Sequence, residues 1–126
     1  MLGLKVRKTK NKGRGVFATK RFKKGEIIEV CPVIIFTPKE YKFLEKTVLD
    51  KYMFAWKTKR DACIPLGYGL VYNHSYSPNA IYGWKHKKKI IFLKALKIIK
   101  RGEEVTINYN WDPENKEHIA DFNVRK

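Results

Sequence analysis

The sequence of 126 residues is poor in cysteine, in acidic side chains and in long apolar runs. Cys31 and Cys63 lack paired spacing and metal-ligand partners, so we interpret both as free thiols in a reducing compartment. No window approaches the roughly 18 apolar residues of a membrane-spanning helix. The first ten residues, MLGLKVRKTK, contain no apolar segment typical of a secretory signal. These absences favour an intracellular protein, cytoplasmic or located in a nucleoid or nucleus, with no membrane partner.

The chain also lacks internal repeats and any linker rich in proline, glycine or serine. A sequence of this length can bury one modest hydrophobic core. The hydrophobic fraction of 44% and the aromatic fraction of 13% favour a folded protein over a disordered one. We therefore expect a single domain over residues 1–126.

Acidic residues are outnumbered by basic ones, 12 against 28, which gives a formal net charge of +16. A field of that size attracts nucleic acid or any acidic surface. However, the basic residues are 22 lysines and only 6 arginines, although arginine is the better ligand for phosphate and base edges. Such a lysine content would also follow from an AT-rich genome. A binding surface and a purely compositional origin therefore both stay open.

Short apolar runs separated by turn signals predict a mostly β fold with one minor helix. Tyr52, Phe54 and Trp56 alternate as in a half-buried strand. The helix is expected over residues 38–47, because Thr37 can cap it, Pro38 suits its first position and Glu40 completes a capping box. The other expected strands are 4–7, 16–18, 26–36 (as two strands broken at Pro32), a hairpin of 81–84 and 90–96 around the lysine-rich loop 85–89, and 105–109.

Taken singly, the residues that could carry chemistry are weak signals. Gly13 and Gly15 are too few for a nucleotide-binding fingerprint and are more typical of a plain turn. His74 alone is more typical of a structural histidine, and Tyr109 alone of a half-buried strand residue. The three histidines show no metal-ligand spacing, so no metal site is predicted.

Taken together and in this order, three motifs are specific. They are GRGVFA at residues 13–18, YNHSYSPN at 72–79 and GEEVTINY at 102–109. This series resembles the SET-domain protein lysine methyltransferases. The resemblance runs from about Val6 to Pro113, leaving a short tail at 114–126, and is greatest to the short stand-alone members. It implies a β-clip fold of several short sheets, in which the segment at 73–75 lies under the C-terminal strand in a pseudo-knot.

The resemblance also implies a cofactor and a substrate. The cofactor is S-adenosylmethionine, which becomes S-adenosylhomocysteine, and the methyl group passes to a lysine ε-amine of a protein such as a histone. Asn73 is expected to bind the amino-acid moiety of the cofactor, and His74 to meet the adenine through its backbone. Gly13, Arg14 and Gly15 form the loop that approaches the cofactor. Within residues 111–126, Trp111 and Phe122 are the best candidates for aromatic packing that completes the site, and Trp111 is expected to contact the cofactor.

Tyr109 matches the family's catalytic tyrosine. Tyr52 and Tyr72 are candidates for the walls of the lysine channel. Tyr82 aligns with a position that in some members lines the channel and limits the number of methyl groups added, although a core tyrosine of the hairpin is an equally good interpretation.

Two departures from the family pattern stand out. Many larger members carry a zinc cluster of cysteines after the catalytic tyrosine, whereas no cysteine follows Cys63 here, so the tail or a homodimer must close the site. The strong positive charge also leaves an alternative, a non-catalytic SET-like module that binds nucleic acid or chromatin. Asn73, His74 and Tyr109 are all present, and this favours the enzyme.

Overall fold

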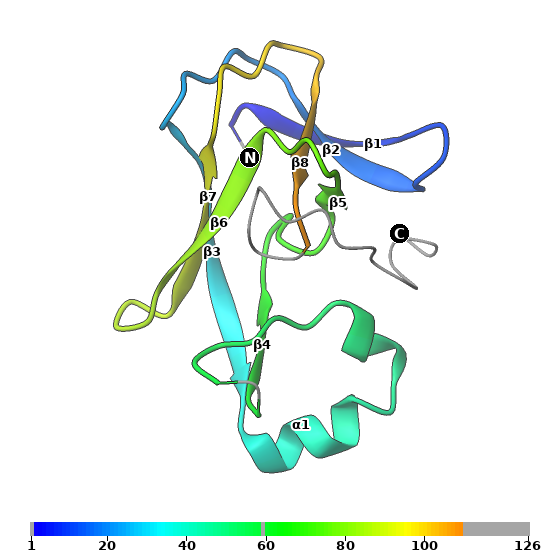
Figure 1. Ribbon diagram of the computed structural model, residues 1–126, viewed down its shortest axis with the longest axis vertical. Coiled ribbons are helices and arrows are strands. Elements are labelled where there is room, and N and C mark those ends of the chain that lie inside the picture. Colours follow the sequence, from blue (N-terminus) through cyan, green and yellow to red (C-terminus); the bar gives the residue numbers. More distant parts are fainter. Residues whose placement is uncertain (1, 59, 110–126) are drawn as a thin grey trace.

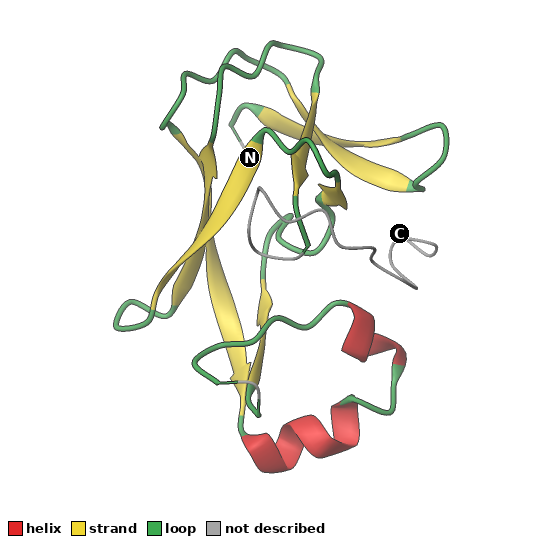
Figure 2. Ribbon diagram, viewed as in Figure 1, coloured by secondary structure: helices red, strands yellow, loops and turns green. Residues whose placement is uncertain are grey.

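A computed structural model of the protein describes residues 2–58 and 60–109. This part of the chain is mostly β-structure, which confirms the predicted fold class (Figure 1). The α-helix α1 (Pro38–Leu44) and a 3-10 helix (Val48–Lys51) lie at one end of the molecule, in the connection between two strands (Figure 2). The strands are β1 (Leu4–Lys8), β2 (Arg14–Ala18), β3 (Ile27–Phe36), β4 (Ala62–Pro65), β5 (Asn73–His74), β6 (Ala80–Lys85), β7 (Ile90–Ala95) and β8 (Glu104–Ile107).

The strands form two four-stranded sheets with the orders β1-β2-β8-β5 and β4-β3-β7-β6. The predicted hairpin is confirmed as β6 and β7, which pair antiparallel along their whole length. β5 and β8 instead run parallel, with Asn73 opposite Thr106 and His74 opposite Ile107. This pairing places the middle of the chain beside the last described strand, and it builds the site discussed below.

The strand β3 is one continuous strand, so the predicted break at Pro32 is wrong. Its first part, Ile27–Pro32, pairs with β7, and its second part, Val33–Phe36, pairs with β4. Proline has no N–H to donate to a β-ladder, but its backbone angles are compatible with an extended chain. Pro32 therefore marks a change of partner in the sheet, where the donor is not needed, and not the end of a strand.

The predicted capping box of α1 is confirmed. The Thr37 hydroxyl oxygen accepts a hydrogen bond from the Glu40 N–H at 3.2 Å, and the Glu40 carboxylate accepts one from the Thr37 N–H at 2.9 Å. The helix ends at Leu44, earlier than predicted, because Thr47 caps the separate 3-10 helix through the Leu49 N–H. Threonine favours such a cap over a helix interior.

The alternating aromatic residues Tyr52, Phe54 and Trp56 do not form the predicted strand. Tyr52 ends the 3-10 helix, and Phe54 makes only an isolated bridge with Cys63. Trp56 lies in the core, at 7% exposure. The alternation in the sequence therefore did not indicate a strand, because Met53 between Tyr52 and Phe54 is partly buried as well and lines the same pocket.

The hydrophobic core joins the two sheets. Phe22 and Ile99, in the loops after β2 and β7, exchange two backbone hydrogen bonds of 2.9 and 3.0 Å and tie these loops together. The core includes the fully buried side chains of Val16, Phe22, Cys31, Ile91, Leu93, Ile99, Val105 and Ile107.

Among the described residues, no helix is both long enough and apolar enough to cross a membrane.

Candidate active site

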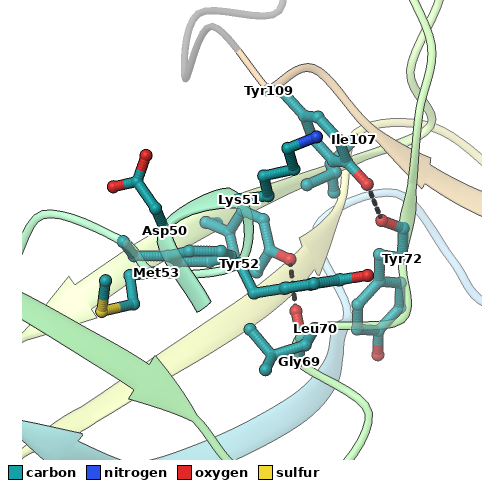
Figure 3. Close-up of a pocket in the computed structure, with 11 residues that line it drawn as sticks. Asp50, Lys51, Tyr52, Met53, Gly69, Leu70, Tyr72, Ile107 and Tyr109 are labelled. Atoms are coloured by element: carbon teal, nitrogen blue, oxygen red, sulfur yellow. Dashed lines mark hydrogen bonds between the residues drawn. The ribbon is translucent and has the colours of Figure 1, made fainter. Parts of the chain in front are cut away.

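A pocket of about 150 Å³ is lined by four tyrosines from four separated segments of the chain (Figure 3). Tyr52 follows the 3-10 helix, Tyr72 precedes β5, Tyr82 lies in β6 and Tyr109 follows β8. The structure thus brings together the four tyrosines that the sequence analysis named. The rest of the wall is mainly apolar and consists of Met53, Phe54, Gly69, Leu70 and Ile107, with Asp50 and Lys51 beside them.

Tyr109 is fixed at both its backbone and its side chain. Its hydroxyl donates a hydrogen bond of 2.6 Å to the Tyr72 carbonyl oxygen, drawn as a dashed line in Figure 3. Its backbone N–H donates one of 3.0 Å to Nδ1 of His74. Because Nδ1 accepts, the neutral imidazole carries its proton on Nε2. The parallel pairing of β5 with β8 is what brings these residues together.

Three hydroxyls of the pocket, those of Tyr72, Tyr82 and Tyr109, are held in their neutral form. Burial raises the pKa of Tyr109 well above the ordinary value of 10.0, and the nearby Tyr52 and Glu104 add to this effect. Burial is also the main cause that raises the pKa of Tyr72 and of Tyr82, with the charge of Glu29 acting in the same direction. At neutral pH, Tyr109 can therefore donate its hydrogen bond but does not act as a phenolate.

We expect these three hydroxyls to ionise only when the protein unfolds. Below pH 10 they are protonated in both the folded and the unfolded chain, so they do not make stability depend on pH. Above about pH 10 the unfolded chain releases these protons and the folded chain does not, so stability falls as the pH rises. In an alkaline titration, the part of the tyrosinate absorbance that comes from these three residues should appear only together with the loss of far-ultraviolet circular dichroism. Full ionisation of all seven tyrosines with unchanged dichroism would contradict this.

Asn73 presents a buried oxygen that has no hydrogen-bond partner among the described residues. The side chain is fully buried, and its amide nitrogen donates to the Arg14 carbonyl at 2.9 Å and to Glu104 Oε2 at 2.8 Å. These two acceptors fix the orientation of the amide, because a flipped amide would place its oxygen against a carboxylate. A buried acceptor without a partner is costly. The site is therefore arranged to receive a donor, such as an ammonium group.

The start of β2 and the residue before it fit closely against this amide. Gly13 has a φ of 71°, which other residues rarely adopt. A Cβ on Gly15 would lie 2.5 Å from Glu104 Oε2 and 2.9 Å from the Asn73 amide nitrogen. From the sequence, these glycines were expected to let the backbone approach a cofactor closely. At Gly15, the described structure shows in addition that the Asn73–Glu104 pair itself requires glycine.

A second hollow of about 220 Å³ adjoins the tyrosine pocket. It is lined by Arg14, Leu49 and Val71, and it shares Tyr52 and Leu70 with the first. The Arg14 side chain, exposed at the start of β2, thus borders a space that meets the tyrosine pocket. Two adjoining spaces are what a reaction between two bound molecules requires.

The roles of Glu104, Phe54 and Glu29 were not predicted from the sequence. Glu104 was given no role of its own within the third motif. Phe54 was assigned to a strand, but it lines the pocket and packs edge-on against Tyr82, with ring centroids 4.8 Å apart. Glu29 interrupts the apolar run EIIEVCPVIIF, and this charge within a β-branched stretch was the available signal. Trp111 lies outside the described residues, and closure of the site by the tail or by a homodimer stays a prediction.

The comparison with protein families decides among the interpretations of this site. The SET domain model matches residues 13–110, which contain all three motifs and the tyrosine pocket. The chain belongs to the SET-domain family. By that membership it is a protein lysine methyltransferase, and the enzyme is confirmed over the non-catalytic alternative.

Relatives of this SET domain agree in sequence and in structure. A histone-lysine N-methyltransferase of Schizosaccharomyces pombe, specific for H3 lysine-37, is 35% identical over 107 residues, which cover 84% of this chain and 72% of the relative. The crystal structure of a Plasmodium falciparum protein described as a candidate histone methyltransferase, PFL0690c, has a TM-score of 0.71 at 29% identity and covers 86% of this chain and 94% of its own. A chain of ctPRC2 bound to H3K27me3 and H3K27M shares the fold, with a TM-score of 0.70 at 22% identity over 84% of this chain and 14% of that one.

The cysteines of this SET domain are not arranged as a metal site in the described structure. Cys31 and Cys63 are buried free thiols, and burial raises the pKa of Cys63 to about 12. A thiol with so high a pKa rarely forms the thiolate that metals and electrophiles require. Within residues 2–58 and 60–109, no group of three histidine, cysteine or acidic side chains is placed to hold a metal ion.

Proposed function

We propose that this SET domain transfers a methyl group from S-adenosylmethionine to the ε-amine of a lysine in histone H3 or another nucleic-acid-associated protein. The observation that carries the proposal is the four-tyrosine pocket, in which Tyr109 is fixed beside the Tyr72 carbonyl. The Schizosaccharomyces pombe relative, which acts on H3, supports the choice of substrate. An enzyme of this kind works where its substrate is, in a nucleus or nucleoid.

The residues around Asn73 fit the proposed cofactor. S-adenosylmethionine supplies a methyl group on a positively charged sulfonium and carries an ammonium group at its amino-acid end. Asn73 Oδ1 would accept a hydrogen bond from that ammonium, because its amide nitrogen is already engaged by Arg14 and Glu104. The backbone of His74 and the loop of Gly13, Arg14 and Gly15 complete the cofactor site in this proposal, with Trp111 from the tail.

The walls of the pocket would prepare the lysine for attack. A lysine amine has a pKa near 10.4, so presenting it in neutral form at pH 7 costs about 4.6 kcal/mol unless that pKa falls. Burial among Tyr52, Tyr72, Tyr82 and the apolar residues around them disfavours the charged ammonium and lowers its pKa. The neutral amine can then attack, and the proton is released to water before the amine is buried.

Tyr109 acts by positioning in this mechanism. Its hydroxyl is neutral and donates to the Tyr72 carbonyl, and a hydroxyl oxygen that donates can also accept a hydrogen bond, here from the amine. The Tyr72 and Gly69 carbonyls at the pocket wall would orient the methyl group through weak C–H···O contacts. Alignment of donor and acceptor in this way can account for a large part of a rate enhancement.

Tyr82 is expected to limit how many methyl groups are added. It is buried at 7% exposure, lines the pocket and donates a hydrogen bond of 2.7 Å to the Gly69 carbonyl. In Tyr82→Phe the lost hydroxyl leaves room for a methylated amine, so the products should shift from monomethyl-lysine toward dimethyl- and trimethyl-lysine. Mass spectrometry of methylated H3 measures this distribution. An unchanged distribution at equal turnover would assign Tyr82 to the core alone.

The direct test of the proposed activity is transfer of a labelled methyl group from S-adenosylmethionine to recombinant histone H3, and in parallel to H3 assembled with DNA. We expect the label on a lysine of H3 in at least one of the two substrates, and mass spectrometry identifies which lysine is methylated. Label on neither, from a folded protein that binds the cofactor, would show that the substrate belongs to another class of protein.

Nucleic acid is a second partner that one observation favours. The loops after β2 and β7 are joined by the Phe22–Ile99 backbone pair, and together they expose seven basic side chains. We expect a labelled DNA duplex to bind, with an affinity that falls steeply as salt rises, because phosphate contacts release counterions. Fluorescence anisotropy at several salt concentrations measures this, and absent or salt-insensitive binding would contradict it. The seven are Lys20, Arg21, Lys23, Lys24, Lys97, Lys100 and Arg101.

A further inference from the structure

Glu29 is a buried carboxylate that the mechanism above does not use. It is 6% exposed in the first half of β3, inside a run of apolar residues. The only ion pair among the described residues is that of Lys20 with Glu26, so Glu29 has no cationic partner there. Burial of a charge without a cation beside it opposes folding unless hydrogen bonds compensate for it. The donors that bind this carboxylate therefore indicate what the residue does.

The fold turns Glu29 inward by an irregularity in the sheet. The pairing of β3 with β7 shifts register between Ile27 and Glu29. In a regular strand successive side chains point to opposite faces, but here Ile28 and Glu29 are both buried and Val30 is exposed. Bulges of this kind often re-aim a side chain next to an active site. The bulge is what directs the carboxylate to the segment behind the tyrosine pocket.

Both carboxylate oxygens hold that segment. Oε2 accepts a hydrogen bond of 3.0 Å from the Tyr68 N–H, and Oε1 accepts one of 2.5 Å from the Tyr72 hydroxyl. Glu29 thus forms hydrogen bonds with the first and the last residue of the turn at 68–72. In Figure 3, the Tyr72 hydroxyl points away from Tyr109, while its carbonyl points toward it.

The same turn supplies the acceptors for two pocket tyrosines. The Tyr82 hydroxyl donates to the Gly69 carbonyl at 2.7 Å, and the Tyr109 hydroxyl donates to the Tyr72 carbonyl at 2.6 Å. A chain of contacts therefore runs from Glu29 through the turn to the hydroxyl beside which the amine would lie. If the turn shifts, both tyrosines lose their anchors.

We infer that Glu29 is a positioning residue for methyl transfer, which acts through the turn at 68–72 on Tyr72, Tyr82 and Tyr109. This inference rests on the proposed function. Glu29 does not touch the cofactor or the lysine. Its carboxylate fixes the Gly69 and Tyr72 carbonyls and the Tyr72 ring at the wall of the pocket. A misplacement of about 1 Å in such a site can lower a rate by about 100-fold.

Glu29→Gln tests the inference with little change in shape. A glutamine has one acceptor oxygen, so one of the two donors would face its amide nitrogen instead. We expect kcat with histone H3 to fall by about 10- to 100-fold, while the dissociation constant of S-adenosylmethionine and the KM for H3 change less than about threefold. Glu26→Gln is the matched control, since it makes the same charge change just before β3 and should keep the wild-type kcat. A wild-type kcat in Glu29→Gln would overturn the inference.

Tyr72→Phe and the double variant separate positioning from general damage. If Glu29 acts through the Tyr72 hydroxyl, the double variant should lose no more turnover than the worse single variant, because both changes break the same hydrogen bond. Losses that multiply would overturn this route. Equal losses of cofactor binding and kcat in Glu29→Gln would instead mean that the residue serves stability alone.

Amide hydrogen exchange supplies a measurement that does not depend on activity. In Glu29→Gln the amides of residues 68–72 should exchange at least about tenfold faster, while those of β6 and β7 stay unchanged. If the wild-type protein binds S-adenosylmethionine but methylates no histone, the proposed substrate fails, and the exchange data still decide whether Glu29 holds the turn. Unchanged exchange at residues 68–72 would overturn the inference whatever the substrate.

Discussion

Replacement of Tyr109 by phenylalanine should lower kcat by about 100-fold or more and leave cofactor binding nearly unchanged. The variant keeps the ring in the pocket but removes the hydroxyl that donates to the Tyr72 carbonyl and would orient the amine. Groups that position or exchange protons at a reacting centre typically contribute about 10²- to 10⁴-fold. Because Tyr109 is neutral in the folded protein, the loss should be the same across the pH range in which the wild type is active.

Single-turnover transfer of a labelled methyl group to histone H3 measures the chemical step directly. Tyr41→Phe serves as the control, because Tyr41 lies on α1 outside the tyrosine pocket and should keep full activity. Calorimetric titration with S-adenosylmethionine shows whether the cofactor site is intact. A Tyr109→Phe variant that retains more than about half of the wild-type rate would remove Tyr109 from the mechanism.

Replacement of Asn73 by alanine should weaken the binding of S-adenosylmethionine by about 10- to 150-fold. The expected loss corresponds to one hydrogen bond to a charged group, about 1.5–3 kcal/mol. The change also removes the two hydrogen bonds to Arg14 and Glu104, so the free energy of unfolding should fall by about 1–3 kcal/mol. Calorimetry measures the first effect, and thermal unfolding without cofactor measures the second.

Asn79 provides a matched control for this experiment. It is another buried asparagine that bonds to β8, but both ends of its amide are satisfied, by the Glu104 carbonyl and by the Thr106 N–H, each at 2.8 Å. Asn79→Ala should therefore lower stability to a similar extent and change cofactor affinity less than about threefold. If the two variants weaken binding equally, the loss in Asn73→Ala is an effect of stability, and Oδ1 of Asn73 does not bind the cofactor.

The sequence by itself determined the family, the mostly β fold and the residues that carry its motifs. Gly13, Gly15, Asn73, His74 and Tyr109 could be named because the motifs keep their order and spacing along the chain. The capping box at Thr37 was equally readable, since it depends on side chains three residues apart. In each case the prediction depends on residues close together in the sequence, or on motifs whose order and spacing are typical of the family.

Patterns of burial were less informative about secondary structure. The alternation of Tyr52, Phe54 and Trp56 came from packing over a core and a pocket, whereas the sequence predicted a strand. Pro32 interrupted no strand, because β3 exchanges one partner for another at that residue. Periodicity indicates which side of a segment is buried, but only the neighbouring strands decide whether its backbone is hydrogen-bonded.

Only the tertiary structure decided what Glu104 and Glu29 do. Glu104 orients the Asn73 amide across 31 residues of sequence, and Glu29 binds Tyr68 and Tyr72 at separations of 39 and 43 residues. The bulge that turns Glu29 inward depends on the pairing with β7, which no local pattern specifies. The physical reason is that a hydrogen bond requires correct distance and direction, and for residues so far apart both are set by how distant strands pair and how the connecting segments pack against them.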